Sequence, residues 1–312
     1  MILVTGISGS LGGLVHRGLS ALDGLTVAAG SRSGDDTITR RIDFDDPATL
    51  STGLRDVDVL VLISAGYAED DVVLARHGAV IDAAAAAGVR HVIYTSLAGS
   101  GELMTIALPH RWTEKRLATA PFDVTVLRNG LYAEVPVGLA VAGAAASAES
   151  GVFAAAFGTG RISVVAREDL AEVAVRVAAE TERDLVDGRR SRHAGKVYEL
   201  EGVTAVGGAD IAEILSESLG RPVRYAPISL GEMRDMLQGS GLEPYQITHT
   251  LSLFANLGAG LLEASSSDLL DLLPSAPRDV RALITGAVQA GGYLSVSVNA
   301  AQAPGGRTLP RP

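Results

Sequence analysis

The sequence predicts a doubly wound α/β fold, in which helices cover both faces of a parallel sheet. Strand-like and helix-like segments alternate over residues 1–130. Residues 57–63 form a continuous apolar run, which is typical of a strand buried on both faces of a parallel sheet. A short strand, a glycine-rich turn and a helix follow one another at the start of the chain. This order is that of a dinucleotide-binding β–α unit.

The elements of the predicted sheet can be placed in order along the chain. Its strands are residues 2–4, 25–29, 41–44, 57–63, 89–95 and 122–127. The helices between them are expected at residues 14–22, from 47, at 72–87 and at 109–118. Repeated β–α units of this kind imply right-handed crossovers.

The alternation breaks after Gly130. Helices are expected at residues 135–148, 167–179, 209–219, 230–237 and 245–257, and strands at 162–165, 196–200 and 223–226. We therefore expect a Rossmann domain over residues 1–130 and a smaller α/β substrate domain over 131–290, with some later strands rejoining the main sheet. Residues 291–312 are rich in Gly, Pro and Ala and are expected to form a flexible tail.

Composition excludes several function classes. A net charge of −10 argues against a nucleic-acid partner. The chain has no cysteine, which excludes disulfides and thiolate chemistry, and its six histidines show no metal-ligand spacing. The first strand starts at residue 2, which leaves no room for a signal peptide, and the alanine-rich run 135–148 is shorter than the ~20 residues that span a bilayer. These features predict a cytoplasmic protein without a metal or a membrane partner.

Three glycines at every third residue follow the first strand: Gly6, Gly9 and Gly12. The first permits a tight turn, the second lets the backbone approach a pyrophosphate, and the third lets the helix pack closely on the strand. The expected cofactor contacts here are Gly6, Ser8, Gly9, Ser10, Leu11 and Gly12.

Ser31 and Arg32 follow the second strand, where an NAD site usually carries an acid. An arginine suits the 2′-phosphate instead, so the pattern favours NADP(H) over NAD(H). Asp43 and Phe44 are expected to flank the adenine, while the acids at 45 and 46 could equally cap the helix that starts at residue 47.

Two further strand ends carry small or polar residues. Ser64, Ala65 and Gly66 would let the cofactor pass closely, and Tyr67 is either a substrate wall or an ordinary half-buried tyrosine. Thr95 and Ser96 end the fifth strand, where the nicotinamide is expected, so we assign Thr95 to the cofactor and Ser96 to catalysis. The chain has no Tyr-x-x-x-Lys sequence, which removes the usual proton donor of short-chain dehydrogenases.

The helix expected at 109–118 holds two further candidates. His110 can titrate near neutral pH and lies at the helix start. Lys115 is one of only two lysines in the chain. If Trp112 packs inward, Lys115 shares its face and turns toward the cofactor; the alternative is a surface lysine paired with Glu114. Both His110 and Lys115 are expected to be catalytic, with Lys115 also binding the cofactor.

Asn129 and Tyr132 follow the sixth strand, where the second domain begins. Asn129 is placed to contact substrate or nicotinamide, or to serve as a turn residue before Gly130. Tyr132 is expected to line the substrate site.

Taken together, these motifs resemble the NmrA-like, atypical short-chain dehydrogenase family. The resemblance rests on Thr-Gly-x-x-Gly-x-x-Gly, Ser-Arg after the second strand, Tyr-Thr-Ser after the fifth, His-x-x-x-Glu-Lys and Leu-Arg-Asn-Gly. It is strongest to the NADPH:quinone oxidoreductase (type 2) members and extends over roughly residues 1–285. It implies a Rossmann domain, a small α/β substrate domain and bound NADP(H).

Two functions remain open from the sequence. The chain is expected to be an NADPH-dependent oxidoreductase that passes hydride to a quinone or another conjugated carbonyl compound. The alternative is a non-catalytic, redox-sensing NADP(H)-binding regulator, because the family that the chain resembles contains both. A small-molecule substrate and a monomeric or homodimeric state are expected.

Overall fold

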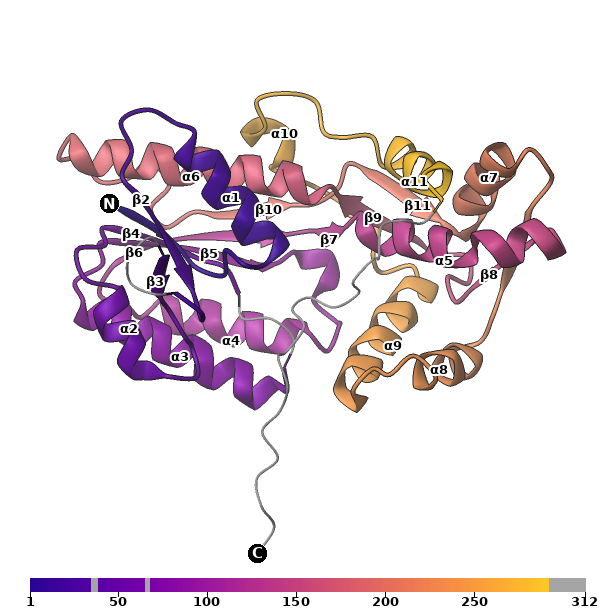
Figure 1. Cartoon of the computed structure of the whole chain (residues 1–312), viewed down its shortest axis with the longest axis horizontal. Helices are drawn as coiled ribbons and strands as arrows, with labels where there is room; N and C mark the ends of the chain where they lie inside the picture. Colours follow the sequence, from indigo (N-terminus) through magenta and orange to yellow (C-terminus); the bar gives the residue numbers. More distant parts are fainter. Residues whose placement is uncertain (35–38, 65–67, 292–312) are drawn as a thin grey trace, which may run out of the picture.

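Within the described residues, seven strands form one parallel sheet in the order β10-β6-β5-β4-β1-β2-β3 (Figure 1). The computed structural model describes residues 1–34, 39–64 and 68–291. The strands are β1 (Ile2–Val4), β2 (Val27–Ser31), β3 (Thr39–Arg41), β4 (Val59–Leu62), β5 (His91–Leu97), β6 (Asp123–Asn129) and β10 (Val197–Leu200). Strands β1 and β4 are central; β2 and β3 follow on the side of β1, and β5, β6 and β10 follow on the side of β4. Every neighbouring pair is parallel. The predicted doubly wound sheet is confirmed.

Helices cover both faces of this sheet. On one face lie α1 (Ser10–Ser20) and α6 (Arg167–Val186). On the other lie α2 (Pro47–Gly53), α3 (Asp70–Ala86) and α4 (Ala107–Leu117). Successive side chains of a strand point to opposite faces. Val59 and Val61 therefore pack in the α1/α6 core, and Leu60 and Leu62 in the α2/α3/α4 core. This double burial explains the continuous apolar run.

A second lobe, shown at the right of Figure 1, has its own apolar core. Its helices are α5 (Glu134–Ser150), α7 (Gly208–Leu219), α8 (Leu230–Gln238), α9 (Pro244–Gly258) and α11 (Val280–Gln289). Its strands form two small sheets: β7 (Leu131–Tyr132), β9 (Arg161–Val165) and β11 (Thr204–Gly207), and β8 (Val152–Ala155) with β12 (Arg224–Pro227). The short helices η1 (Gly99–Gly101) and α10 (Leu269–Leu272) lie in connections. None of the described helices is both long and apolar enough to traverse a bilayer.

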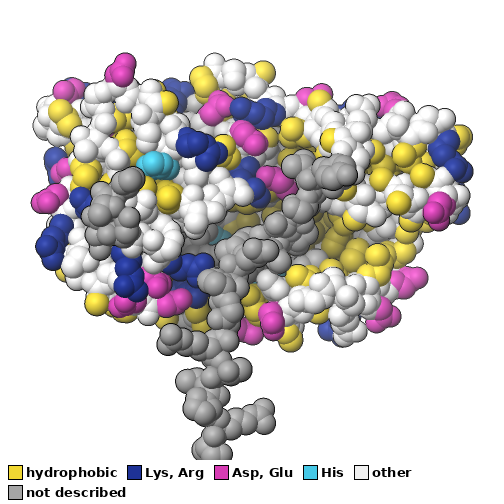
Figure 2. Space-filling view, viewed as in Figure 1, with side chains coloured by type: hydrophobic (Ala, Val, Ile, Leu, Met, Phe, Trp, Pro, Cys, Tyr) yellow, Lys and Arg dark blue, Asp and Glu magenta, His cyan; other side chains and the backbone are white. Residues whose placement is uncertain are grey.

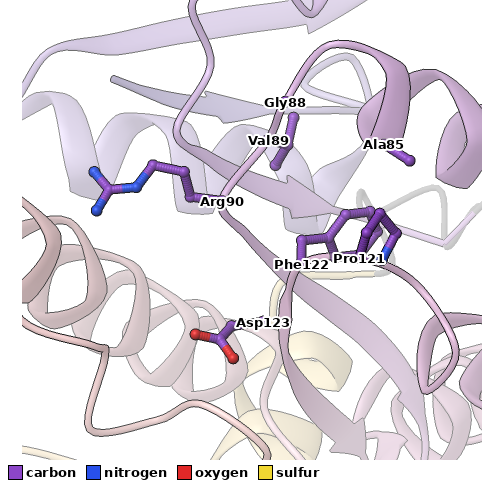
Figure 3. A pocket seen from close by; sticks show the side chains of 7 residues that line it. All are labelled: Ala85, Gly88, Val89, Arg90, Pro121, Phe122 and Asp123. Carbon is purple, nitrogen blue, oxygen red and sulfur yellow. The ribbon is translucent and has the colours of Figure 1, made fainter.

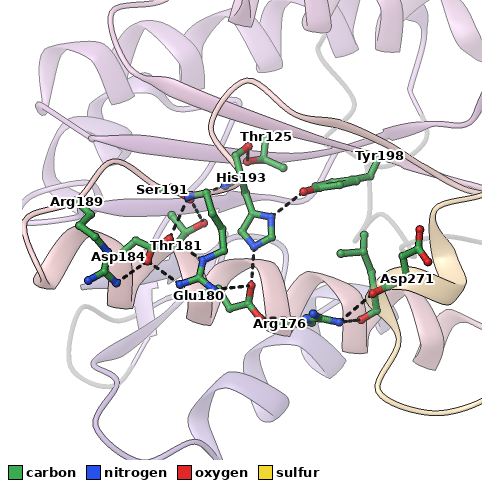
Figure 4. A network of polar contacts seen from close by, with 12 residues as sticks. Thr125, Arg176, Glu180, Thr181, Asp184, Arg189, Ser191, His193, Tyr198 and Asp271 are labelled. Atoms are coloured by element: carbon green, nitrogen blue, oxygen red, sulfur yellow. Dashed lines mark hydrogen bonds and ion pairs between the residues drawn. The ribbon is translucent and has the colours of Figure 1, made fainter.

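The chain returns to the first lobe through α6 and β10. A polar network secures this return (Figure 4). His193 places Nδ1 2.9 Å from the Tyr198 hydroxyl and Nε2 2.9 Å from a Glu180 carboxylate oxygen. Thr125 donates to the His193 carbonyl oxygen at 2.7 Å. The network joins α6 and β10 to β6, so β10 rejoins the main sheet; the division of the chain at residue 130 stays a prediction.

Several boundaries differ from those expected. The third strand lies at Thr39–Arg41, before the expected 41–44, and the helix expected at 167–179 continues to Val186. The strands β7, β8 and β11 and helix α11 were not expected. These strands have two to four residues, too few to establish an alternating pattern. The expected tail at 291–312 lies, after Gly291, outside the described residues.

Candidate functional site

The loop between β1 and α1 is folded tightly enough to receive a phosphate. Gly6 has a positive φ of 63°, and the Gly9 amide donates to the Gly6 carbonyl oxygen at 2.9 Å. A Cβ on Gly12 would lie 2.4 Å from the same oxygen, so only glycine fits there. No side chain caps the N-terminus of α1 at Gly9. Its first N–H groups are therefore left for an anionic ligand, and the loop fits a dinucleotide pyrophosphate.

A cavity of about 450 Å³ opens beside this loop, between the N-terminal ends of α1 and α6. It is lined by Ile7, Ser8, Gly9, Ser10, Gly13, Leu14, Arg17, Arg167 and Glu168. A larger cavity, about 630 Å³, lies around the start of β5 and β6 (Figure 3). That is the amino edge of the sheet, whereas ligands of open α/β sheets bind at the carboxyl edge. The smaller cavity is therefore the one associated with the candidate site.

Two threonines brace the end of β4, where the cofactor is expected. The Thr5 hydroxyl oxygen accepts from the Ile63 amide at 3.0 Å, and that of Thr95 from the Ser64 amide at 3.0 Å. Thr95 is buried, and its hydroxyl binds backbone of the neighbouring strand. It shapes the sheet edge, and its predicted contact with the cofactor stays a prediction. Ala65, Gly66 and Tyr67 lie outside the described residues.

The adenosine end of the cofactor is expected at the carboxyl ends of β2 and β3. Ser31 is buried with its hydroxyl 3.3 Å from that of Ser33, and Arg32 is exposed. Phe44 packs against the α2/α3/α4 core. The alternative role of the acids at 45 and 46 as caps of α2 is wrong: neither side chain bonds the N-terminal amides of that helix, although Asp46 occupies the N-cap position. Asp45 pairs instead with Arg76.

A charged network lies at the carboxyl ends of β5, β6 and β10. The Ser96 hydroxyl donates to Glu114 at 2.5 Å, and Arg128 binds both oxygens of the same carboxylate at 3.0 and 2.6 Å. Arg111 reaches Glu114 at 2.8 Å, and Arg128 also reaches Glu199 at 2.8 Å. Burial alone would raise the pKa of Glu114, but the bonds from Arg128 and Ser96 and the charge of Arg111 lower it on balance. Glu114 is therefore ionised at neutral pH, and Ser96, which is 4% exposed, positions it.

His110 lies beside a buried tyrosine. Its Nδ1 is 2.8 Å from the hydroxyl of Tyr94, which is fully buried. Burial lowers the pKa of His110 to about 4 and raises that of Tyr94. The expected titration of His110 near neutral pH is therefore wrong, because its surroundings disfavour the imidazolium. The side chain offers neutral hydrogen-bonding nitrogens at this pH.

Trp112 of helix α4 was expected to pack inward, but the structure places it at the surface. The buried positions of α4 are Ala107, Pro109, Thr113 and Leu117, and Trp112 is 38% exposed. Lys115 is exposed as well. Trp112 and Lys115 therefore do not share a buried face of α4, and the role of Lys115 at the cofactor stays a prediction. The alternative pairing with Glu114 also differs from the structure, in which arginines hold that carboxylate.

Asn129 and Tyr132 border the entrance to the second lobe. Asn129 is 5% exposed, and its Oδ1 has no hydrogen-bond partner among the described residues. Arg167 lies 4.8 Å from the centre of the Tyr132 ring and pairs with Glu134 at 3.1 Å. Burial raises the pKa of Glu134. An amide oxygen buried without a partner suits a ligand N–H donor.

Helix α9 reaches over to the first lobe, a contact that the sequence did not predict. Thr105 places its hydroxyl 2.6 Å from Nδ1 of His249, and its amide donates to Ser252 at 3.0 Å. On the face shown in Figure 2, apolar side chains gather over α5, α8 and α9. The only signal for α9 in the sequence was its helical pattern, which does not indicate where the helix packs.

Among the described residues, no group of acids and histidines could hold a metal ion.

No protein-family model matches the chain. The chain is 34% identical over 252 residues to quinone oxidoreductase 2 of Escherichia coli K12, spanning 78% of this chain and 82% of that protein. A solved structure of the NADPH-dependent quinone oxidoreductase of E. coli complexed with NADPH matches with a TM-score of 0.79 at 31% identity, covering 92% and 99% of the two chains. The triphenylmethane reductase of Citrobacter sp. complexed with NADP(H) matches with a TM-score of 0.79 at 28% identity and the same coverage.

Proposed function

Because the chain belongs to the NmrA-like, atypical short-chain dehydrogenase family, we propose that it transfers hydride from NADPH to a quinone or another conjugated carbonyl compound. It is an NAD(P)H-dependent oxidoreductase, and NADP(H) is the preferred cofactor. The expectation of an enzyme is thereby confirmed.

The observation that carries the proposal is the glycine loop. A Cβ on Gly12 would lie 2.4 Å from the Gly6 carbonyl oxygen, and the start of α1 has no side-chain cap. The amides that follow Gly9 would hold the pyrophosphate, and Arg32 would hold the 2′-phosphate. When bound, NADPH supplies the hydride from its nicotinamide ring.

Asn129, at the end of β6, would hold the carboxamide of the nicotinamide, and His110 of α4, which is hydrogen-bonded to Tyr94 of β5, would orient the acceptor. The Asn129 oxygen is free among the described residues to accept from an amide donor, and His110 is neutral near pH 7. A neutral imidazole can polarise a carbonyl oxygen without giving up a proton. A quinone suits such a site, because the hydroquinone anion formed on hydride transfer is comparatively stable.

The second lobe would supply the walls of the acceptor site. Apolar side chains gather over α5, α8 and α9 (Figure 2), as suits a flat, conjugated acceptor. This assigns cofactor binding mainly to residues 1–130 and acceptor binding mainly to 131–290, with Tyr132 at the border between them.

Steady-state assays with NADPH or NADH and a panel of quinones, enals and triphenylmethane dyes test the proposal. We expect NADPH to be oxidised faster than NADH at equal concentrations, with a quinone as the best acceptor. Efficient turnover of another acceptor class, with all quinones at background, would contradict the quinone assignment and leave the oxidoreductase assignment standing.

A further inference from the structure

Charged residues from three separate elements meet at the adenosine end of the cofactor site. Arg32 follows β2, Asp43 and Asp45 follow β3, and Arg76 lies on α3. The Asp45 amide donates to Asp43 at 3.1 Å, which fixes the loop locally. Asp45 thus lies within electrostatic reach of Arg32, the residue that the proposed function assigns to the 2′-phosphate.

Asp45 and Arg76 form a two-pronged ion pair. Nε of Arg76 lies 2.7 Å from Oδ1 of Asp45, and Nη2 lies 2.7 Å from Oδ2. The Arg76 side chain is 21% exposed and that of Asp45 50% exposed. Such a fork matches a planar guanidinium to a carboxylate and is stronger than a single contact. It ties the loop after β3 to α3.

The pair also has an electrostatic consequence for Arg32. Hydrogen bonding from Arg76 lowers the pKa of Asp45, and Arg32 adds to this effect through its charge. Asp45 is therefore ionised at neutral pH, and its charge interacts with that of Arg32. Without Arg76, this carboxylate would compete with a phosphate for Arg32 and would repel a phosphate dianion brought close to it.

We propose that Arg76 is a positioning residue for NADP(H) specificity: by binding Asp45 it neutralises that carboxylate and leaves Arg32 free to bind the 2′-phosphate. The inference rests on the proposed role of Arg32. It assigns to a residue of α3, outside the glycine loop and the end of β2, a share in the choice between NADP(H) and NAD(H).

Binding of NADP⁺ and NAD⁺ by isothermal titration calorimetry to Arg76→Gln, Asp45→Asn and the double variant tests this role. Arg76→Gln should weaken NADP⁺ binding about tenfold, equivalent to ~1.4 kcal/mol, and NAD⁺ binding less than about twofold. Asp45→Asn alone should leave NADP⁺ binding unchanged or tighter. The double variant should recover NADP⁺ binding, because no carboxylate remains to be neutralised.

Arg116→Gln is the matched control, since Arg116 forms an exposed ion pair with Asp82 of α3 at 2.5 Å. It should change neither affinity. Equal losses for both cofactors in Arg76→Gln, or no recovery in the double variant, would overturn the role of Arg76 and leave the cofactor assignment intact. A wild-type chain that binds NAD⁺ as tightly as NADP⁺ would overturn the assignment of Arg32, and this inference with it.

Discussion

At the scale of single residues, the proposed preference for NADP(H) depends on one side chain at a strand end. Arg32 follows β2, where NAD sites usually carry an acid, and its side chain is exposed. The buried Ser31 hydroxyl, 3.3 Å from that of Ser33, orders the turn that presents it. The sequence alone predicted that Arg32 follows the end of a strand, because apolar runs indicate where the strands of a parallel sheet end.

Arg32→Ala should therefore weaken NADP⁺ much more than NAD⁺. A charge-assisted hydrogen bond contributes roughly 1.5–3 kcal/mol, so we expect about a ten- to hundredfold loss for NADP⁺ alone. Calorimetric titration of both cofactors measures it. The exposed Arg55 offers a control in Arg55→Ala, which should leave both affinities intact. Equal losses for the two cofactors would remove Arg32 from the phosphate site.

The partners of individual side chains were harder to predict. Ser96 and Glu114 are 18 residues apart, and Glu199 joins their network through Arg128. These contacts depend on how α4 and β10 pack against the sheet, which sequence spacing does not specify. The same applies to Trp112, since the apolar pattern of α4 is too sparse to fix which face is buried.

At the scale of elements, the glycine loop and α1 form the most predictable unit. The first glycine was expected to form a tight turn and the third to allow close packing. The positive φ of Gly6 and the close approach at Gly12 agree with these expectations. Longer elements were predicted better than short ones. The helix at 135–148 was placed within a few residues of α5, whereas the four-residue β8 and β11 were missed.

Gly12→Ala should disrupt this unit. The added methyl group would lie 2.4 Å from a backbone oxygen, so the loop must open and NADP⁺ binding should fall at least about tenfold. Gly286→Ala is the matched helix control, because a Cβ there meets nothing within 4 Å. It should raise the free energy of unfolding by about 0.5–1 kcal/mol without affecting binding. Unchanged NADP⁺ affinity in Gly12→Ala would contradict the close-packed loop.

Helix α4 offers a contrast between adjacent residues. Glu114→Gln leaves Arg111 and Arg128 without their shared carboxylate and should lower the free energy of unfolding by about 1–3 kcal/mol. Lys115→Met, at an exposed site, should change it by less than about 0.5 kcal/mol. Urea unfolding measures both. Lys115→Met also tests the untested role of the lysine: a tenfold or larger loss of kcat/KM, with stability unchanged, would return it to the active site.

At the scale of the whole molecule, stability is expected to depend on pH through three histidines: His77 and His91, which are buried, and His110, which is half-buried beside Tyr94. Burial lowers the pKa of His77 to about 3 and those of His91 and His110 to about 4. Their unfolded pKa is about 6.5, so the unfolded chain takes up these protons first as pH falls. The stabilisation that the neutral histidines provide is complete at pH values above about 6.5. It is lost progressively as the pH falls toward the pKa values of the folded chain.

The free energy of unfolding should therefore decrease between about pH 7.5 and about pH 5.5, by about 1 kcal/mol for each of these three histidines. Most carboxylates stay ionised over this window, so the histidines dominate the change. Urea unfolding at the two pH values provides the measurement. A constant free energy across the window would show that these histidines are not held neutral in the folded chain.

The two-lobe arrangement places the glycine loop, Asn129 and the α9 contacts around the carboxyl edge of one sheet. The central claim is that this edge carries hydride transfer from NADPH to a quinone. Its most direct test is a single-turnover measurement, in which the chain preloaded with NADPH is mixed anaerobically with a quinone. We predict that NADPH absorbance is lost in step with formation of one equivalent of hydroquinone. NADPH that stays bound and unoxidised while the quinone is unchanged would contradict the claim.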